Sequence, residues 1–247
     1  GALYQGSKPV MWSPVEKTAL AEAEVEYHDR QTDAIWVPFK VQNSGALGGA
    51  FVVIWTTTPW TIPQNRGICF GPSISYGLYE VTGTPDDCRA KVGYRYLVAD
   101  KLAEVALSAK RLEAGHYTRL RDISADELAT LVTHHPLNGA EGANSEWDFE
   151  VKLFAGDHVT DDAGTGFVHT APSHGDDDYQ IGLKHGLEMT YNILDDSSFR
   201  ADLPFFAGLR VIEENGKAGK ANKAVIDKLV EVGGLLARRR ITISDAH

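Results

Sequence analysis

The sequence predicts a mixed α/β fold that is rich in β-structure, with a barrel-like β core and peripheral helices. Short stretches rich in Val, Ile and aromatic residues recur between turn signals, and only a few helical patterns lie among them. No internal repeat divides the 247 residues, and a chain of that length can bury a sizeable core. From its length, the chain could form one large domain, or a core with a smaller appendage.

The predicted strands follow a poorly alternating lead-in of about 30 residues. Pro9 and Pro14 favour an extended lead-in, with a short helix or strand at 18–27. Strands are predicted where β-branched and aromatic residues gather, at 34–41, 50–60, 68–70 with its flanks, 75–81, 94–99, 149–159 and 164–171. The stretch 135–147 is rich in turn residues.

Four helices are predicted, at 101–110, at 124–132, from about 176, and at 221–234. Asp100 is expected to cap the first of them. Ser124 and Glu127 have the spacing of a capping box at the start of the second. Gly233 is expected to end the last helix, because glycine accepts the left-handed conformation common at that position.

Composition and charge exclude several classes of protein. The net charge of −10 argues against a general nucleic-acid binder, because phosphate contacts need clustered Lys and Arg. No apolar run approaches the roughly 20 residues that span a bilayer, and no secretory leader is evident, so we expect a cytoplasmic protein without a membrane partner. Cys69 and Cys88 are then expected to be free thiols, and two cysteines are too few for a zinc site built on cysteine pairs.

The stretch HTAPSHGDDDYQIG could hold a metal, cap a helix or bind a substrate. Asp176 follows Ser173 by three positions, as in a capping box. Because the helix dipole favours acids in a first turn, Asp176 and Asp177 are expected to begin a helix. Asp178 lies a turn deeper, where its carboxylate could face back toward His169.

A metal site would need two or three ligands that converge. His169 and His174 are five positions apart across Pro172, which suits neither a helical i, i+4 pair nor a zinc-protease helix. The metal interpretation is therefore the weakest of the three, although it stays open.

Two further motifs could meet a ligand. In WTTTPWT, Pro59 removes a donor from the ladder and should end strand pairing. This would leave the hydroxyls and backbone N–H groups of Thr56, Thr57 and Thr58 free, although β-propensity alone also explains the threonines.

In DDAGTGFVHTA the glycines permit close backbone approach, but their spacing is not that of a nucleotide-binding loop. His169, at the end of this strand, can equally be structural, and no nucleophile with an adjacent motif stands out.

Taken together, these motifs resemble one family. The segments KPVMWSPVEKTALAEAEVEY, WTTTPWTIPQNRGICF and GTGFVHTAPSHGDDDYQIGLKHGLE are similar to those that surround and build the editing domain of isoleucyl-tRNA synthetase, one of the class I synthetases of the Ile/Val/Leu type. The resemblance covers nearly the whole chain in the same order. Thr58-Pro59-Trp60 favours the isoleucyl member over the valyl and leucyl ones, and the ATP-binding signatures are absent. Asp176 departs from many members but leaves Asp178 unaffected.

The resemblance implies hydrolytic editing: water deacylates valyl-tRNA(Ile), and possibly valyl-adenylate, without a cofactor or metal. One methylene contributes only about 1–3 kcal/mol to discrimination, a limit for which isoleucyl-tRNA synthetases are the standard example. A second site that admits only the smaller, valyl side chain would supply the rest. By similarity, Asp178 would bind the α-ammonium group, and Thr57 and His169 would form the wall of the side-chain pocket. Thr56 and Thr58 would contact the terminal adenosine or the water, and Trp60 would pack beneath that loop or against the adenosine.

The implied partners are the 3′ CCA end of tRNA(Ile) carrying valine, and the catalytic core of a parent synthetase. The chain is then expected to be one editing domain of a larger enzyme, with about 1–30 and 236–247 as linker strands toward that core. The basic stretches 217–223 and 238–240 are either local tRNA contacts or solvated surface. Two alternatives stay open: a non-catalytic module that binds the aminoacylated CCA end or a small amino acid, and a metal-dependent hydrolase that uses His169, His174 and the aspartates.

Overall fold

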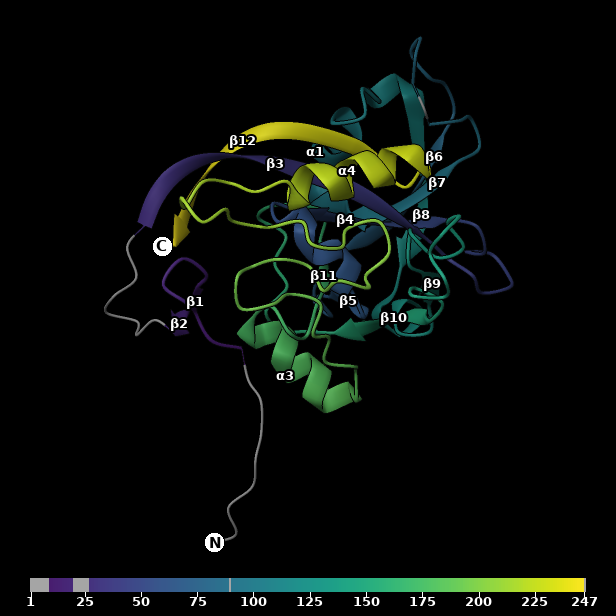
Figure 1. The fold of residues 1–247 in the computed structure, drawn as a ribbon. Helices are drawn as coiled ribbons and strands as arrows, with labels where there is room; N and C mark the ends of the chain where they lie inside the picture. The colour runs from purple at the N-terminus through teal and green to yellow at the C-terminus, as the bar shows by residue number, and fades with distance from the viewer. Residues whose placement is uncertain (1–8, 20–26, 89, 247) are drawn as a thin grey trace, which may run out of the picture.

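Two open β-sheets form the centre of the described residues, 9–19, 27–88 and 90–246, in a computed structural model (Figure 1). The predicted β-rich mixed α/β class is confirmed. The β core is nevertheless not a closed barrel: within the described residues the strands form sheets of six and four, plus a two-stranded hairpin. The reason is that each larger sheet ends in strands that do not pair with each other, β12 and β8 in one and β11 and β9 in the other.

The six-stranded sheet has the order β12-β3-β4-β7-β6-β8. Its strands are β3 (Tyr27–Lys40), β4 (Phe51–Thr56), β6 (Tyr76–Val81), β7 (Arg95–Ala99), β8 (Tyr117–Ile123) and β12 (Ala237–Ala246). The sequence did not predict β8, because most of its side chains are polar and exposed at the edge of the sheet.

β3 and β12 form a long antiparallel ribbon that projects beyond the rest of the sheet (Figure 1). Their register runs from Trp36 opposite Ala237 to Tyr27 opposite Ala246. β4 pairs with β3 only from Ile35 onward, so the outer part of the ribbon stands alone. β3 is therefore longer than predicted, and the element expected at 18–27 is described only at Thr18, Ala19 and Tyr27.

The four-stranded sheet has the order β11-β5-β10-β9. Its strands are β5 (Gly67–Phe70), β9 (Val132–His134), β10 (Glu150–Ala155) and β11 (Phe167–Thr170), and the hairpin consists of β1 (Trp12–Ser13) and β2 (Thr18–Ala19). β5 is buried along its whole length, as its apolar sequence GICF predicts. Its pairing with β11 places His169 opposite Ile68 and so fixes the position of His169 on the sheet.

Short helices surround the sheets. The α-helices are α1 (Ala103–Ser108), α2 (Ala125–Leu128), α3 (Asp176–His185) and α4 (Ala221–Glu231), and the 3₁₀ helices are η2 (Pro59–Gln64), η3 (Asp100–Leu102) and η4 (Ala114–His116). Ile181 of α3 packs on Cys69 of β5, and α4 packs on η2. α4 ends as predicted: Gly233 has φ +72° and donates to the Val230 carbonyl, while Gly234 donates to that of Leu229.

Two predicted helix caps differ from the structure. Asp100 does not cap a helix: it begins η3, and its carboxylate instead accepts hydrogen bonds from Ser75, Tyr79 and Arg119. The polar side chains of β6 and β8 compete successfully for that carboxylate. Ser173 is not the cap of α3 either, because Gly175 holds that position and the Ser173 hydroxyl donates to the Thr190 carbonyl, 2.7 Å away.

The Ser124–Glu127 capping box forms only in part. The Ser124 hydroxyl accepts the Glu127 backbone N–H, 3.1 Å away, as predicted. The Glu127 carboxylate binds the Arg121 guanidinium rather than the Ser124 N–H. α2 also ends at Leu128, earlier than predicted, because β9 begins at Val132.

Candidate active site

A cavity of about 370 Å³ lies where β4, β11 and the start of α3 meet. Five of the six residues that the sequence singled out as site residues line it: Thr56, Thr57, Thr58, His169 and Asp178. Further lining comes from Trp55, Thr61, His158, Thr160, 163–168, Ala171 and His174. Strand ends from both sheets therefore bring together residues more than 100 positions apart in sequence.

The threonine loop, residues 56–58, begins where β4 stops pairing. β4 ends at Thr56 and Pro59 begins η2, so the predicted interruption by Pro59 is confirmed. The expectation that these hydroxyls and backbone N–H groups are free is wrong for Thr56 and Thr58: the Thr58 N–H donates to Thr56 Oγ1 at 3.1 Å, and the two hydroxyl oxygens lie 3.3 Å apart. Hydroxyl-bearing side chains commonly close such local turns. Among the described residues no partner binds the Thr57 hydroxyl, which leaves it available to a ligand.

His169 is held at both ring nitrogens. The Asn65 side-chain amide lies 2.8 Å from Nδ1, and Thr61 Oγ1 lies 2.8 Å from Nε2. The same Asn65 nitrogen also donates to the Gly67 carbonyl, which orients the amide with its NH₂ toward the imidazole. Nδ1 is therefore the acceptor and Nε2 carries the proton. The Thr61 hydroxyl accepts that N–H and donates its own hydrogen bond to the Thr58 carbonyl.

Burial keeps this imidazole neutral. His169 is 7% exposed, and burial lowers its pKa to about 3, with a smaller contribution from His174. Because neither nitrogen is free, the ring presents a fixed, uncharged surface to the cavity. A ring that is held at both nitrogens and uncharged is suited to form a rigid wall of the cavity.

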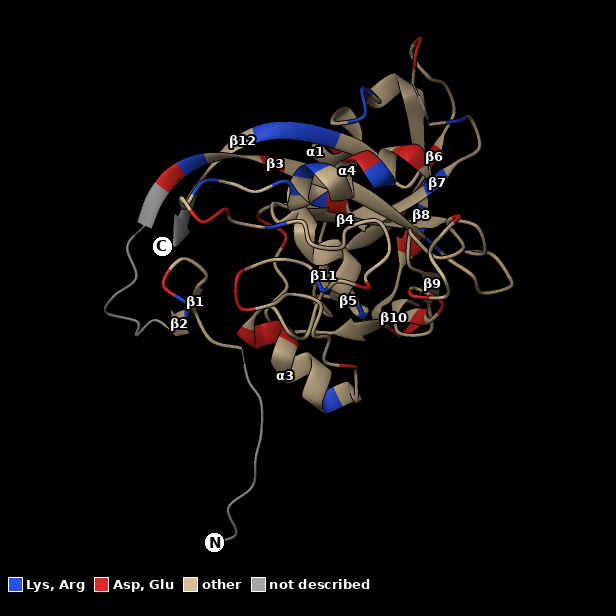
Figure 2. Cartoon of the chain, viewed as in Figure 1, with Lys and Arg blue, Asp and Glu red and all other residues tan. Residues whose placement is uncertain are grey.

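Asp178 lies in the first turn of α3 and lines the cavity. Its Oδ2 accepts the backbone N–H of Ala171 at 3.0 Å, which turns the carboxylate back toward the strand that carries His169, as predicted. Burial raises the pKa of Asp178 to about 7, and the negative charge of Asp177 adds to this, while the Ala171 N–H opposes it. Asp176 and Asp177 begin the helix as expected and are exposed (Figure 2).

The glycines of the GTG motif allow residues 163–168, which line the cavity, to pack closely against β4 and β7. Gly164 has φ +77°, and a Cβ there would lie 3.2 Å from the Trp55 ring. Gly166 has φ +81°, and a Cβ there would overlap that of Ala99. Both positions therefore require glycine, for conformation as well as for space.

Trp60 does not line this cavity. It lines a neighbouring hollow of about 500 Å³, which shares Thr58, Thr61 and His174 with the cavity. The Trp60 ring meets the His174 ring edge-on, with centroids 4.9 Å apart. Trp60 thus supports the cavity wall, and its contact with an adenosine stays a prediction.

Other reactive groups are less favourably placed. Cys69 and Cys88 are free thiols, as predicted. Burial raises the pKa of Cys69 to about 11, so its thiol stays protonated at neutral pH. In the described part of the chain, no three His, Cys, Asp or Glu side chains are grouped so that they could hold a metal ion.

Three residues of the site were not predicted from the sequence: Thr61 and Asn65, which orient His169, and His158, which lines the cavity. Asn65 precedes the apolar stretch of β5 and is completely buried. A buried amide needs hydrogen-bond partners, so a lone asparagine beside a buried strand is a signal that could have indicated it. The Nε2 atom of His158 is buried without a partner among the described residues.

The fold corresponds to a known class of domain. A crystal structure of GlLeuRS-CP1, the CP1 segment of a leucyl-tRNA synthetase, superposes with a TM-score of 0.51 at 16% identity, over 87% of this chain and all of that one. That likeness shows that the chain has the fold of a CP1 domain. The model of the family described as tRNA synthetases class I (I, L, M and V) matches residues 1–227, so the chain belongs to the class I tRNA synthetases.

Its relatives include isoleucine–tRNA ligases. The enzyme of Ruegeria pomeroyi is 56% identical over the whole of this chain, which covers 26% of that relative. The enzyme of Bradyrhizobium diazoefficiens is 48% identical, with 100% of this chain and 25% of the relative covered. The chain therefore spans about a quarter of the length of the curated relatives that it matches. No helix among the described residues could span a membrane.

Proposed function

We propose that the chain deacylates valyl-tRNA(Ile), with valyl-adenylate as a second candidate substrate, by directing water onto the aminoacyl carbonyl. The observation that carries this proposal is that Thr56–Thr58, His169 and Asp178 line one cavity. The family membership and the CP1 fold support the same reaction.

Asp178 is proposed to bind the α-ammonium group of the aminoacyl ester. Its Oδ2 is held by Ala171, and the described residues give Oδ1 no partner, so one oxygen is oriented and the other is available. A carboxylate with a pKa of about 7 is partly protonated at neutral pH. An arriving cation favours the ionised form, and the charge-assisted bond then fixes the ester in the cavity.

Hydrolysis needs little more than orientation, because the ester is already activated. Water adds to the carbonyl carbon, the bond to the ribose oxygen breaks, and that oxygen leaves with a proton as valine is released. The hydroxyl of Thr57 and the loop around Thr56 and Thr58 are proposed to orient the water or to stabilise the developing oxyanion. A fixed wall at His169 limits the side chain that fits, because an extra methylene in a tight pocket adds strain.

The proposed partners are the 3′ CCA end of tRNA(Ile) carrying valine, and the catalytic core of a parent synthetase in the cytoplasm. We propose that the β3–β12 ribbon forms the linker strands toward that core, which supports treating 1–247 as one editing domain. Arg238, Arg239 and Arg240 make β12 the most basic part of this acidic chain (Figure 2). Asp33 pairs with Arg238 and Arg240, which leaves a modest positive charge near the ribbon.

The test compares release of labelled amino acid from valyl-tRNA(Ile) and isoleucyl-tRNA(Ile), with and without a chelator. We expect the chain to hydrolyse the valyl ester, to spare the isoleucyl ester, and to be unaffected by the chelator. Binding of a nonhydrolysable valyl-adenosine analogue without turnover would identify a binding module instead. Loss of activity in chelator would support a metal-dependent hydrolase. Unchanged valyl hydrolysis by Asp178→Ala would contradict the assignment of the amine-binding group.

A further inference from the structure

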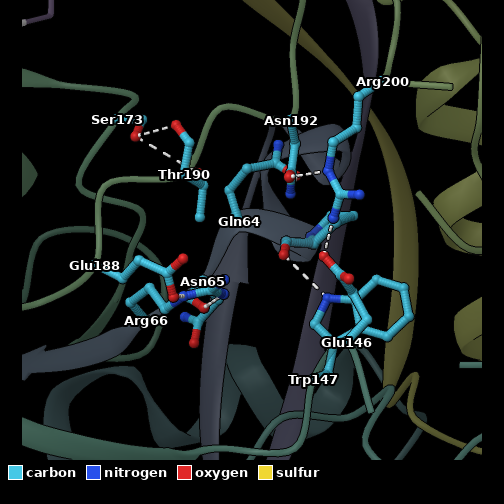
Figure 3. Close-up of polar contacts among 11 residues, drawn as sticks. Gln64, Asn65, Arg66, Glu146, Trp147, Ser173, Glu188, Thr190, Asn192 and Arg200 are labelled. Carbon is cyan, nitrogen blue, oxygen red and sulfur yellow. Dashed lines mark hydrogen bonds and ion pairs between the residues drawn. The ribbon is translucent and has the colours of Figure 1, made fainter. Parts of the chain in front are cut away.

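One segment, Glu188–Asn192, contacts residues beside each of the two elements that carry the candidate site (Figure 3). We name it the bridging segment. On one side it meets Gln64, the last residue of η2, and Arg66, and on the other it meets Ser173 in the turn that precedes α3. The threonine loop carries Thr57 and α3 carries Asp178, so this segment spans the two walls of the cavity.

The bridging segment makes these contacts through Glu188, Thr190 and Asn192. Glu188 forms an ion pair with Arg66 at 3.4 Å. The Thr190 carbonyl accepts the Ser173 hydroxyl at 2.7 Å, and the Asn192 side chain donates to Gln64. The Glu188 side chain is 72% exposed, so its ion pair contributes little. The segment is therefore held in place mainly by the Thr190–Ser173 and Asn192–Gln64 hydrogen bonds.

The link between Asn192 and Gln64 is buried. Asn192 is 5% exposed and Gln64 is fully buried, with 3.2 Å between Asn192 Nδ2 and Gln64 Oε1. Gln64 uses the other end of its amide to donate to the Trp60 carbonyl at 2.9 Å, which ties it to the start of η2. Because buried amides are costly to leave unpaired, this link fixes η2 against the bridging segment.

Arg200 in turn fixes the position of Asn192. Arg200 Nε donates to Asn192 Oδ1 at 2.9 Å, and the Arg200 backbone N–H donates to the Asn192 carbonyl at 2.8 Å. Arg200 also pairs with Glu146, next to Trp147, whose indole N–H donates to the Pro63 carbonyl at 3.0 Å (Figure 3). The side-chain amide of Asn192 is therefore fixed at both ends, which gives η2 a rigid support.

We propose that Asn192 is a positioning residue for the candidate site: through Gln64 it sets the separation between the threonine loop and the first turn of α3, and so the width of the cavity. This inference rests on the proposed editing function. Asn192 does not line the cavity, so it acts through the backbone of η2 and the adjoining Thr58. A site that must separate two side chains differing by one methylene depends on cavity width, and a misplacement of about 1 Å can lower a rate on the order of 100-fold.

The test measures valyl and isoleucyl ester hydrolysis by Asn192→Ala and by Gln64→Met, which keeps the length of the side chain and removes its amide. The matched control is Thr133→Val, which removes a fully buried hydroxyl that donates to the Val151 carbonyl, away from the cavity. All three variants should lose some thermal stability. Only the first two should lower kcat for the valyl ester, by on the order of 10- to 100-fold, and reduce the valyl-to-isoleucyl ratio.

The double variant separates positioning from general destabilisation. If the two residues act as a unit, the Asn192→Ala/Gln64→Met variant should lose no more activity than the worse single variant. The inference is overturned if Asn192→Ala and Gln64→Met resemble Thr133→Val, with lower stability but an unchanged ratio. If the wild-type chain binds without turnover, the same ratio is measured as affinity for valyl- and isoleucyl-adenosine analogues. A wild-type chain that neither hydrolyses nor binds removes the proposed function, and this inference with it.

Discussion

Thr61 Oγ1 lies 2.8 Å from His169 Nε2, and this contact joins η2, which directly follows the threonine loop, to β11. Since Asn65 occupies the other ring nitrogen, the imidazole N–H has Thr61 as its acceptor. The wall of the candidate site is therefore set by a chain of buried hydrogen bonds that runs from Asn65 through His169 to Thr61 and the Thr58 carbonyl.

We predict that Thr61→Val lowers the free energy of unfolding by about 1–3 kcal/mol, because it leaves the buried His169 N–H unpaired at nearly constant volume. Urea denaturation measures this loss. Hydrolysis assays should also show a smaller valyl-to-isoleucyl ratio, because the imidazole is no longer held. A variant with wild-type stability and selectivity would show that Thr61 does not fix the wall.

His169→Ala should enlarge the cavity and admit the isoleucyl ester. Removing a buried ring leaves space that the surroundings fill only in part. We expect isoleucyl-tRNA(Ile) hydrolysis to rise at least tenfold relative to the valyl ester, since one methylene contributes about 1–3 kcal/mol. Phe154→Ala, a change away from the cavity lining, is the control for a general loss of packing. Continued exclusion of isoleucine by His169→Ala would assign the size limit to another residue.

Strand positions were predictable because β-branched and aromatic runs mark buried strands directly, as in β4 and β5. The grouping of Thr57, His169 and Asp178 came from the resemblance, since no periodicity shows that segments about 110 positions apart meet. The hydrogen-bond partners could not be predicted. Asp100 and Ser173 carry local capping patterns, yet both are used by residues far away in sequence, so tertiary contacts override the local preference.

The raised pKa of Asp178 predicts a pH-dependent affinity for an amine ligand. The carboxylate accepts an ammonium group only when ionised, so affinity for a nonhydrolysable valyl-adenosine analogue should rise as the pH passes through about 7. It should fall again above about 8, where an α-amino group loses its proton. Calorimetric titration from pH 5.5 to 9 measures this. Asp178→Asn should bind weakly and lose the rise on the acid side; a rise that persists in this variant belongs to another group.

The raised pKa of Asp178 also predicts that its carboxylate lowers the free energy of unfolding at neutral pH. Its pKa in the folded chain, about 7, lies above the ordinary value of 3.8. The folded state therefore holds the proton more tightly, and this contribution to stability is complete below about pH 4 and is lost as the pH rises through 7. Asp178→Asn should melt at a higher temperature than the wild type at pH 8, with a smaller difference at pH 5. Asp176→Asn, an exposed change in the same turn, should show no such trend. Equal melting temperatures at pH 8 would mean that Asp178 is not desolvated.

Gly166→Ala tests whether the close approach of the GTG wall is required. At φ +81° a side chain is strained, and the new Cβ would overlap Ala99 and lie 3.1 Å from the Tyr76 ring. Left-handed strain of about 1–2 kcal/mol and overpacking of about 1–3 kcal/mol together predict that the free energy of unfolding falls by about 2–5 kcal/mol.

Gly139→Ala is the matched control, because Gly139 has φ +75° but no atom within 4 Å of its Cβ position. It should therefore show the strain alone, about 1–2 kcal/mol. Urea unfolding of both variants measures the difference, and equal losses would mean that packing against Ala99 does not constrain this wall.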